Sequence, residues 1–311
     1  MIENLLVMIG GLALFMYAIT LLRETLGKIS GKRVAKILET TTDSPVKGMG
    51  VGTAATLMTQ SSSITVLTLI GFVNAGMMTF RQSVHVMLGS EIGTTITAQL
   101  VSFKIGIDFA WLLIAIGFFT TMFLKNENVK MAGRVIFSLG LLFLSMDFMK
   151  NGASELGQSQ IFVDLIIAFG VVPIFGILIG AAIAGITQSS STTTSLVIAM
   201  SMAGVIGLPA AIALIMGANI GTCFLENMAA IGATTPAKRT AIAQTIINIV
   251  GVAVFFPFFG QFADIVALTS NDLPRQIANA HTIFNVTVSF MLIPFLGLIV
   301  KLCEKRMPDK E

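Results

Sequence analysis

Two copies of one polar motif are the residues of this chain best suited to bind an ion. The run from Thr59 to Ser63 reads Thr-Gln-Ser-Ser-Ser, and the same five letters recur from Thr187 to Ser191. Serine hydroxyls donate hydrogen bonds to oxyanions, and a glutamine carboxamide has a donor and an acceptor end. A helix that begins within the motif adds unpaired amide groups and a positive dipole end. The residues predicted to bind an anion are Gln60, Ser61, Ser62, Ser63, Gln188, Ser189, Ser190 and Ser191.

The two motifs belong to a longer internal repeat. Gln188 follows Gln60 by an offset of 128 residues, and the same offset aligns segment 89–95, Gly-Ser-Glu-Ile-Gly-Thr-Thr, with segment 217–223, Gly-Ala-Asn-Ile-Gly-Thr-Cys. Two separate motifs in one register indicate duplication rather than chance. We predict a first repeat over about 5–124 and a second over about 135–260.

The elements that carry these motifs are predicted to lie in a bilayer. Of 311 residues, 55% are hydrophobic and 11% are charged, whereas soluble domains carry about 25% charged residues. Apolar runs long enough to cross a membrane recur along the whole chain. The predicted full spans are 5–22, 83–101, 109–124, 135–149, 209–231, 241–260 and 280–302, the last lying outside both repeats.

The polar motifs interrupt two further apolar stretches, 48–73 and 166–206. Polar backbone at membrane depth is tolerated only where it lines a cavity or is covered by protein, so each stretch is predicted to be a re-entrant helical hairpin. The fold class expected is an all-α integral membrane protein with two repeats. Each repeat is expected to contain one hairpin and one broken transmembrane helix.

Orientation follows from counting spans and basic residues. The first repeat contains three full spans and one hairpin, and the hairpin returns the chain to the side from which it entered. Because three crossings are an odd number, the second repeat starts on the opposite side of the membrane, so the repeats are expected to be inverted. Most Lys and Arg residues then lie on one side, which the positive-inside rule makes cytoplasmic. We therefore expect a multi-pass protein of the plasma membrane, in bacteria the inner membrane, with its C-terminus in the cytoplasm and its N-terminus outside. Segment 23–43, rich in charges, is predicted to be an amphipathic interfacial helix.

Oxygen-bearing side chains near the motifs are candidate ligands of a small hard cation. Glycines four apart in 89–94 and 217–222 predict a helix break followed by a threonine. The alternative is that these glycines only allow close helix packing, while the serines only bond neighbouring helices. Glu91 is ionisable within a predicted span, and its counterpart is Asn219. The residues predicted to bind this cation or support its site are Gln60, Gln188, Thr94, Asn219, Thr222, Glu91, Thr59, Thr187, Asn248 and Asn285.

Other classes of function find no support in the residues. Hydrolase and zinc-protease motifs are missing, and two His and two Cys are too scattered to ligate a transition metal. We expect no enzyme activity, no cofactor besides coupling ions, and no nucleic-acid partner, because the net charge of +3 reflects basic loops. The expected partners are a small anion, a cation and the lipid bilayer. A homodimer is left open.

At these motifs the chain resembles the sodium-dependent phosphate cotransporters, the type II sodium/phosphate symporters and their bacterial relatives. The resemblance rests on the paired Gln-Ser-Ser-Ser motifs, on Gly-Ala-Asn-Ile-Gly-Thr at 217–222, and on Ala-His-Thr-Ile-Phe-Asn at 280–285. It implies a phosphate and sodium site between the repeats, symport by alternating access, and a single transport domain over 1–311. The first repeat departs from the pattern, because Ser90 and Glu91 replace Ala and Asn.

Two alternatives to sodium-coupled phosphate transport remain. The same site could carry another anion, such as sulfate or a dicarboxylate, or the protein could be a passive anion channel. Competition by those anions and the dependence of flux on a sodium gradient separate these cases.

Overall fold

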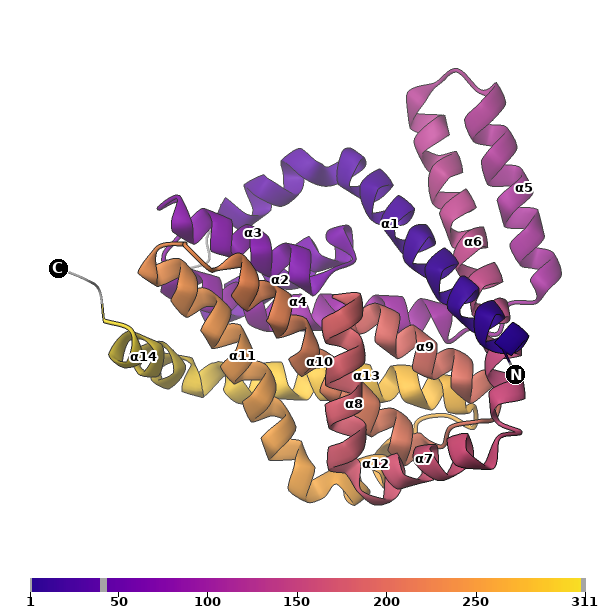
Figure 1. The fold of residues 1–311 in the computed structure, drawn as a ribbon. Helices are drawn as coiled ribbons and strands as arrows, with labels where there is room; N and C mark the ends of the chain where they lie inside the picture. The colour runs from indigo at the N-terminus through magenta and orange to yellow at the C-terminus, as the bar shows by residue number, and fades with distance from the viewer. Residues whose placement is uncertain (1, 40–43, 309–311) are drawn as a thin grey trace.

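The computed structural model describes residues 2–39 and 44–308, and its regular structure in these ranges is entirely helical (Figure 1). The helices are α1 (Ile2–Glu39), α2 (Pro45–Thr59), α3 (Ser62–Asn74), α4 (Phe80–Val101), α5 (Ile107–Phe123), α6 (Glu127–Leu156), α7 (Gln160–Val171), α8 (Pro173–Thr187), α9 (Ser190–Met202), α10 (Leu208–Ala229), α11 (Thr235–Phe255), α12 (Phe259–Ala267), α13 (Leu273–Leu292) and α14 (Leu296–Arg306).

The internal repeat is visible in where helices begin and end. Helices α2, α3 and α4 recur, with both ends displaced by the same 128 residues, as α8, α9 and α10. Helix α11 likewise begins 128 residues after α5. In both sets the middle helix is short, and the first packs along the third, α2 on α4 and α8 on α10. The repeated motifs therefore specify a repeated helical arrangement.

Each polar motif forms a turn between two half-length helices. Gln60 ends α2 with φ 52° and ψ 28°, and Gln188 ends α8 with φ 55° and ψ 27°. Of the described residues other than glycine, these two alone have positive φ, a left-handed conformation that costs energy in a residue with a Cβ. The next residue is extended, and its hydroxyl caps the second helix: Ser61 accepts from Ile64 N and Ser189 from Thr192 N. The pattern predicted this helix start correctly.

These paired helices are too short to cross a bilayer separately. Helices α2 and α8 have 15 residues each, and α3 and α9 have 13. At about 1.5 Å per residue they measure roughly 20–22 Å, less than the hydrocarbon core of about 30 Å. Their length suits helices that enter a membrane without crossing it.

The helix breaks predicted at 89–94 and 217–222 are wrong, because α4 and α10 run through both segments without interruption. The glycines serve close packing instead. A Cβ on Gly89 would overlap the Met49 carbonyl oxygen of α2, and one on Gly217 would overlap the Ile177 carbonyl oxygen of α8. The interruptions of long helices lie elsewhere, at short 3₁₀ turns over Phe256–Phe258 and Ile293–Phe295 that contain Pro257 and Pro294.

Gly217→Ala is expected to destabilise the protein by about 1–3 kcal/mol, because the new methyl group must push α8 and α10 apart. Gly297→Ala is the matched control, since a Cβ on Gly297 of α14 meets open space. Thermal melting of the two detergent-purified variants should show a lower midpoint for Gly217→Ala only. Equal midpoints would contradict the close packing of these helices.

Five helical stretches among the described residues are long and apolar enough to span a membrane: 3–28, 127–156, 208–229, 235–267 and 273–306. Helices α4 and α5 occupy two more predicted spans but are not among these five. Helix α7 meets α8 at 111°, and this bent pair would add a sixth span. Helix α1 continues through the predicted interfacial segment to Glu39, and residues 40–43 of that segment lie outside the described ones. The chain is a multi-pass membrane protein.

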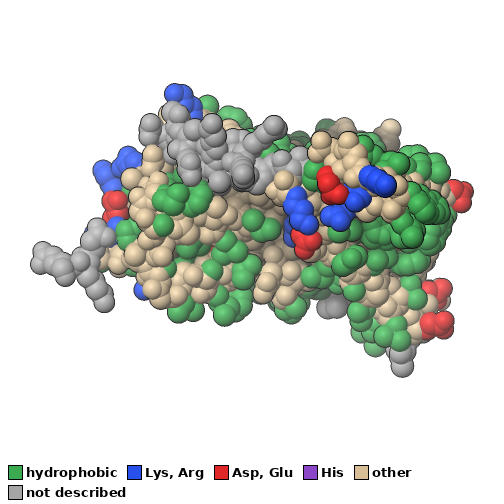
Figure 2. All heavy atoms as spheres, turned by 90° about the horizontal axis from the view of Figure 1, so that it is seen from above, with side chains coloured by type: hydrophobic (Ala, Val, Ile, Leu, Met, Phe, Trp, Pro, Cys, Tyr) green, Lys and Arg blue, Asp and Glu red, His purple; other side chains and the backbone are tan. Residues whose placement is uncertain are grey.

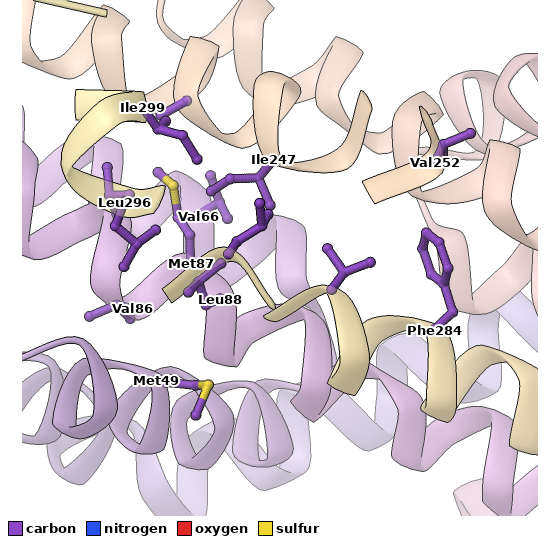
Figure 3. Packing of buried hydrophobic residues seen from close by; sticks show 14 of the residues in the cluster. Met49, Val66, Val86, Met87, Leu88, Ile247, Val252, Phe284, Leu296 and Ile299 are labelled. Carbon is purple, nitrogen blue, oxygen red and sulfur yellow. The ribbon is translucent and has the colours of Figure 1, made fainter. Parts of the chain in front are cut away.

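Apolar side chains divide between a packed interior and an exposed belt. One buried cluster joins α2, α3 and α4 to α11, α13 and α14, with Met87, Ile247 and Phe284 among its members (Figure 3). Helix α5, by contrast, exposes Trp111 and Phe119 with many other apolar side chains. Figure 2 shows wide hydrophobic areas between a few groups of charges. Exposed apolar area of this extent is expected of a surface that faces lipid.

Candidate functional site

The two polar motifs meet at one cavity of about 210 Å³. Helix α1 supplies one wall, the turn before α3 and the turn before α9 supply the others, and α10 contributes a single leucine. The lining residues are Met16, Ile19, Thr20, Arg23, Ser61, Ser63, Ile64, Leu67, Thr187, Gln188, Ser189, Thr192 and Leu225. Residues 128 positions apart in the sequence therefore share one small space.

The electrostatics of this cavity favour an anion. The N-terminal ends of α3 and α9 both border it, and each adds a partial positive charge and unpaired amide groups. Arg23 adds a full positive charge that persists at any physiological pH. The lining residues that the structure describes include no Asp or Glu. Hydroxyls of Ser61, Ser63 and Ser189 can donate to oxyanion oxygens at the same place.

Arg23 also ties α1 to the first turn. Its Nε donates to the carbonyl oxygen of Gln60 at 3.1 Å. The Gln60 side chain is buried, and both ends of its carboxamide are hydrogen-bonded within the protein. Its Nε2 donates to the Leu57 carbonyl at 2.5 Å, and its Oε1 accepts from Thr97 Oγ1 at 3.0 Å. The Gln188 side chain is exposed and lines the cavity. Equivalent glutamines thus have different surroundings.

The predicted anion-binding residues divide accordingly. Ser61, Ser63, Gln188 and Ser189 line the cavity, with Thr187 of the sodium set beside them. Four others are outside the lining although they belong to the same turns and helix starts: Gln60, Ser62, Ser190 and Ser191. Thr59 Oγ1 bonds to Thr65 Oγ1 at 3.2 Å, which braces the first turn. The structure therefore brings the two motifs together but gives their members different positions.

Most of the predicted sodium residues lie away from this cavity, in the buried interior of the long helices. Asn219 Nδ2 donates to Asn285 Oδ1 at 2.6 Å, which links α10 to α13. Thr222 Oγ1 donates to the Asn219 carbonyl at 2.9 Å, and Thr94 Oγ1 donates to the Ser90 carbonyl at 3.1 Å. The Oδ1 atom of Asn219 is buried without a hydrogen-bond partner. An unpaired buried oxygen is suited to a cation.

Glu91 lies on α4 and faces α11. Gln244 Nε2 donates to Glu91 Oε1, and Asn248 also hydrogen bonds to the Glu91 carboxyl group. Asn248 Nδ2 lies 3.3 Å from Cys223 Sγ on α10. Glu91 and Asn248 thus belong to a polar network that connects α4, α10 and α11. Among the described residues, no group of three or more His, Cys, Asp or Glu side chains is placed to bind a metal ion.

Sequence patterns missed four residues of the site. Arg23 directly follows the first predicted span, where the positive-inside rule accounts for a basic residue, and no local motif marks it as a neighbour of Gln60. Thr20 stands one helical turn before Arg23, a spacing that places both on one face of α1. Thr192, which lines the cavity, and Thr97, which donates to Gln60 Oε1, also lie outside the predicted set. Thr192 extends the second polar motif by one residue, which is a signal that sequence reading could have used.

Comparison with known proteins agrees with this architecture. A family model described as Na+/Pi-cotransporter matches residues 14–151 and 158–298. The chain belongs to this family. Its members are transporters rather than enzymes. No solved structure matches the chain.

Three relatives show the range of the family. A Bacillus subtilis protein named "Uncharacterized protein YqeW" is 29% identical over 298 residues, covering 95% of this chain and 96% of the relative. The Salmonella typhimurium "Putative inorganic phosphate export protein YjbB" is 25% identical over 99% of this chain and 56% of its own length. The human "Sodium-dependent phosphate transport protein 2B" is 32% identical over 137 residues, covering 40% of this chain and 20% of the relative. The chain thus spans about half of the named export protein.

Proposed function

We propose that this protein carries inorganic phosphate across the membrane together with sodium, and that phosphate binds in the cavity between the two polar turns. The observation that supports this most is the meeting of both motifs and Arg23 at one cavity without an acidic lining residue. Two helix N-termini and a guanidinium give an oxyanion several charge-assisted hydrogen bonds. The names of two relatives, a putative inorganic phosphate export protein and a sodium-dependent phosphate transport protein, favour phosphate over other anions.

Sodium coupling has a physical reason. A phosphate ion that loses its water within a membrane protein carries an energetic penalty, which nearby cations reduce. Arg23 supplies one positive charge, fewer than a phosphate dianion carries negative charges. A bound sodium ion reduces the remaining imbalance, so phosphate and sodium are expected to bind together. Buried oxygens such as Asn219 Oδ1 offer places for such an ion.

Alternating access is the mechanism that we propose for crossing the membrane. Two repeats in inverted orientation form two similar halves, and rocking of these halves would open the central cavity to one side and then the other. In this proposal the C-terminus lies in the cytoplasm and the N-terminus outside. The direction of net transport is then set by the gradients, so the same carrier can import or export phosphate.

Uptake of labelled phosphate into proteoliposomes tests this function. We expect saturable uptake that is stimulated by an inward sodium gradient and lost when choline replaces sodium. Sulfate and a dicarboxylate in tenfold excess are expected to leave it unchanged. Uptake that does not depend on sodium and does not saturate would indicate a channel instead. If sulfate competed with labelled phosphate as well as unlabelled phosphate does, the protein would be a carrier of a different anion.

A further inference from the structure

A second polar site, apart from the phosphate cavity, lies between α4, α10 and α11. Glu226 on α10 has no exposed surface, and both of its carboxyl oxygens are buried without a hydrogen-bond partner. Glu91 on α4 is also buried, and its carboxyl group hydrogen bonds to Asn248. Asn248 Nδ2 lies 3.3 Å from Sγ of Cys223, which stands three residues before Glu226 on α10, so one polar network contains both glutamates. Two buried carboxylates in one network are unstable as charged groups unless a cation neutralises at least one of them.

A third group points to a ligand in this cluster. Gln244 is fully buried, and its amide donates to Glu91, so its carboxamide is directed into the cluster. The Oε1 atom of the same carboxamide has no partner. The unpartnered atoms here are Glu226 Oε1, Glu226 Oε2 and Gln244 Oε1. All three are oxygens, and buried oxygens that receive no hydrogen bond are available to bind a cation.

The surroundings of the two carboxyl groups indicate how many positive charges the cluster can bind. Glu91 already receives hydrogen bonds from the amide groups of Gln244 and Asn248. Glu226 receives no such amide hydrogen bond, and the polar group beside it is the thiol of Cys223 on the same helix. The ion pairs present among the described residues, Lys104 with Asp272 and Lys130 with Glu127, involve neither carboxyl group. One uncompensated carboxylate calls for one positive charge. A monovalent cation fits this need.

We infer that Glu226, Glu91 and Gln244 form a binding site for one monovalent cation, either sodium or a proton. The site differs from the phosphate cavity and from the unpaired oxygen of Asn219. Asn219 precedes Glu226 by seven residues, which on a helix corresponds to about 10 Å along the axis. One ion cannot bridge these two positions.

The position of this site on α10 couples it to the phosphate cavity, because the same helix borders both. Leu225 lines the cavity, and its neighbour Glu226 belongs to the cation cluster. Consecutive residues on a helix point about 100° apart, so α10 presents one face to each site. A cation that changes how α10 packs against α4 and α11 would also move a wall of the cavity. This consequence rests on the proposed function, whereas the cation site itself does not.

Other buried ionisable side chains must be considered when the pH is varied. Arg239 on α11 donates to the Met307 carbonyl oxygen through Nε and Nη2, so its guanidinium is directed toward the C-terminal end of the chain. His281 on α13 has both ring nitrogens buried without a partner. Where the structure describes side chains, the buried ionisable ones besides the two glutamates are His85, Cys223, Arg239, His281 and Cys303.

The inference can be tested on purified protein without phosphate and without transport. The thermal melting midpoint is measured against sodium concentration, with choline keeping the ionic strength constant, and then against pH in sodium-free buffer. Glu226→Gln and Glu91→Gln remove one charge each, and Glu155→Gln, an exposed position on α6, is the matched control. If Glu226→Gln fails to fold, Glu226→Asp is measured in its place. This variant retains the negative charge but shortens the side chain by one methylene group, which moves the carboxyl group away from the cation.

For a sodium site, we expect half-maximal stabilisation of Glu226→Gln and Glu91→Gln to need at least tenfold more sodium than in the wild type. For a proton site, sodium has no effect on the wild type, and the pH dependence of its melting is flattened in both variants. Glu155→Gln should match the wild type in each case. Glu226 and Glu91 variants that keep the wild-type sodium and pH responses would overturn the inference, whatever the result of phosphate uptake.

Discussion

Replacing Arg23 with glutamine is expected to weaken phosphate binding about 10- to 150-fold, which corresponds to the roughly 1.5–3 kcal/mol of a hydrogen bond to a charged group. Arg23 is the single positively charged side chain among the described residues that line the cavity. Its loss should affect the phosphate dianion more than the monoanion, so the effect should grow as pH rises. Equilibrium binding of labelled phosphate to purified protein, at saturating sodium and several pH values, measures it.

Two further variants separate the charge of Arg23 from its contact with Gln60. Arg23→Lys keeps the charge but loses the planar guanidinium that donates to the Gln60 carbonyl, so an intermediate loss of affinity is expected. Arg81→Gln removes an exposed arginine outside the cavity and should bind as the wild type does. Wild-type affinity in Arg23→Gln would exclude Arg23 from the phosphate site.

Gln188→Glu is expected to reduce phosphate affinity strongly at neutral pH, because an ionised carboxylate would stand in the cavity beside the anion. Two like charges about 4 Å apart at an effective dielectric near 20 repel by roughly 4 kcal/mol. That exceeds the roughly 1 kcal/mol of a lost neutral hydrogen bond. Affinity should partly recover at lower pH as the new carboxyl group takes up a proton. Labelled phosphate binding measures both effects.

Gln60→Glu should behave differently although Gln60 occupies the same place in the first repeat. Its side chain is buried between Thr97 and the Leu57 carbonyl, so a carboxylate there would lose the donor to Leu57 and face a carbonyl oxygen. We expect a lower melting midpoint rather than a selective loss of phosphate binding. Gln158→Glu, at an exposed position outside the cavity, is the control for added charge. Identical effects at positions 60 and 188 would contradict the asymmetry of the two turns.

The parts of the fold that the sequence predicts are those encoded by local and repeated patterns. The polar motifs predicted where α3 and α9 begin, because serine caps a helix and an apolar run follows it. The offset between the motifs also predicted that helical arrangement would recur, and α2 to α4 recur as α8 to α10. Composition was enough to place the chain in a membrane.

What the sequence could not predict depends on contacts between distant segments. Glycines four apart are compatible with a helix break and with close packing, and only the presence of the Ile177 carbonyl beside Gly217 decides between them. Arg23 follows an apolar run, as many basic residues at membrane surfaces do, and its role depends on a turn 37 residues away. Glu226 attracts notice by its charge alone, and its unpaired oxygens become evident only in three dimensions.

Protection of a cysteine in the cavity by phosphate tests the central claim most directly. Thr20 is exposed to the cavity, whereas the native Cys223 and Cys303 are buried, so Thr20→Cys should introduce one readily reactive thiol. We predict that phosphate with sodium slows its labelling by a maleimide, at the phosphate concentrations that saturate uptake, and leaves a Gln158→Cys control unchanged. A labelling rate at position 20 that stays the same with and without phosphate would contradict binding between the two polar turns.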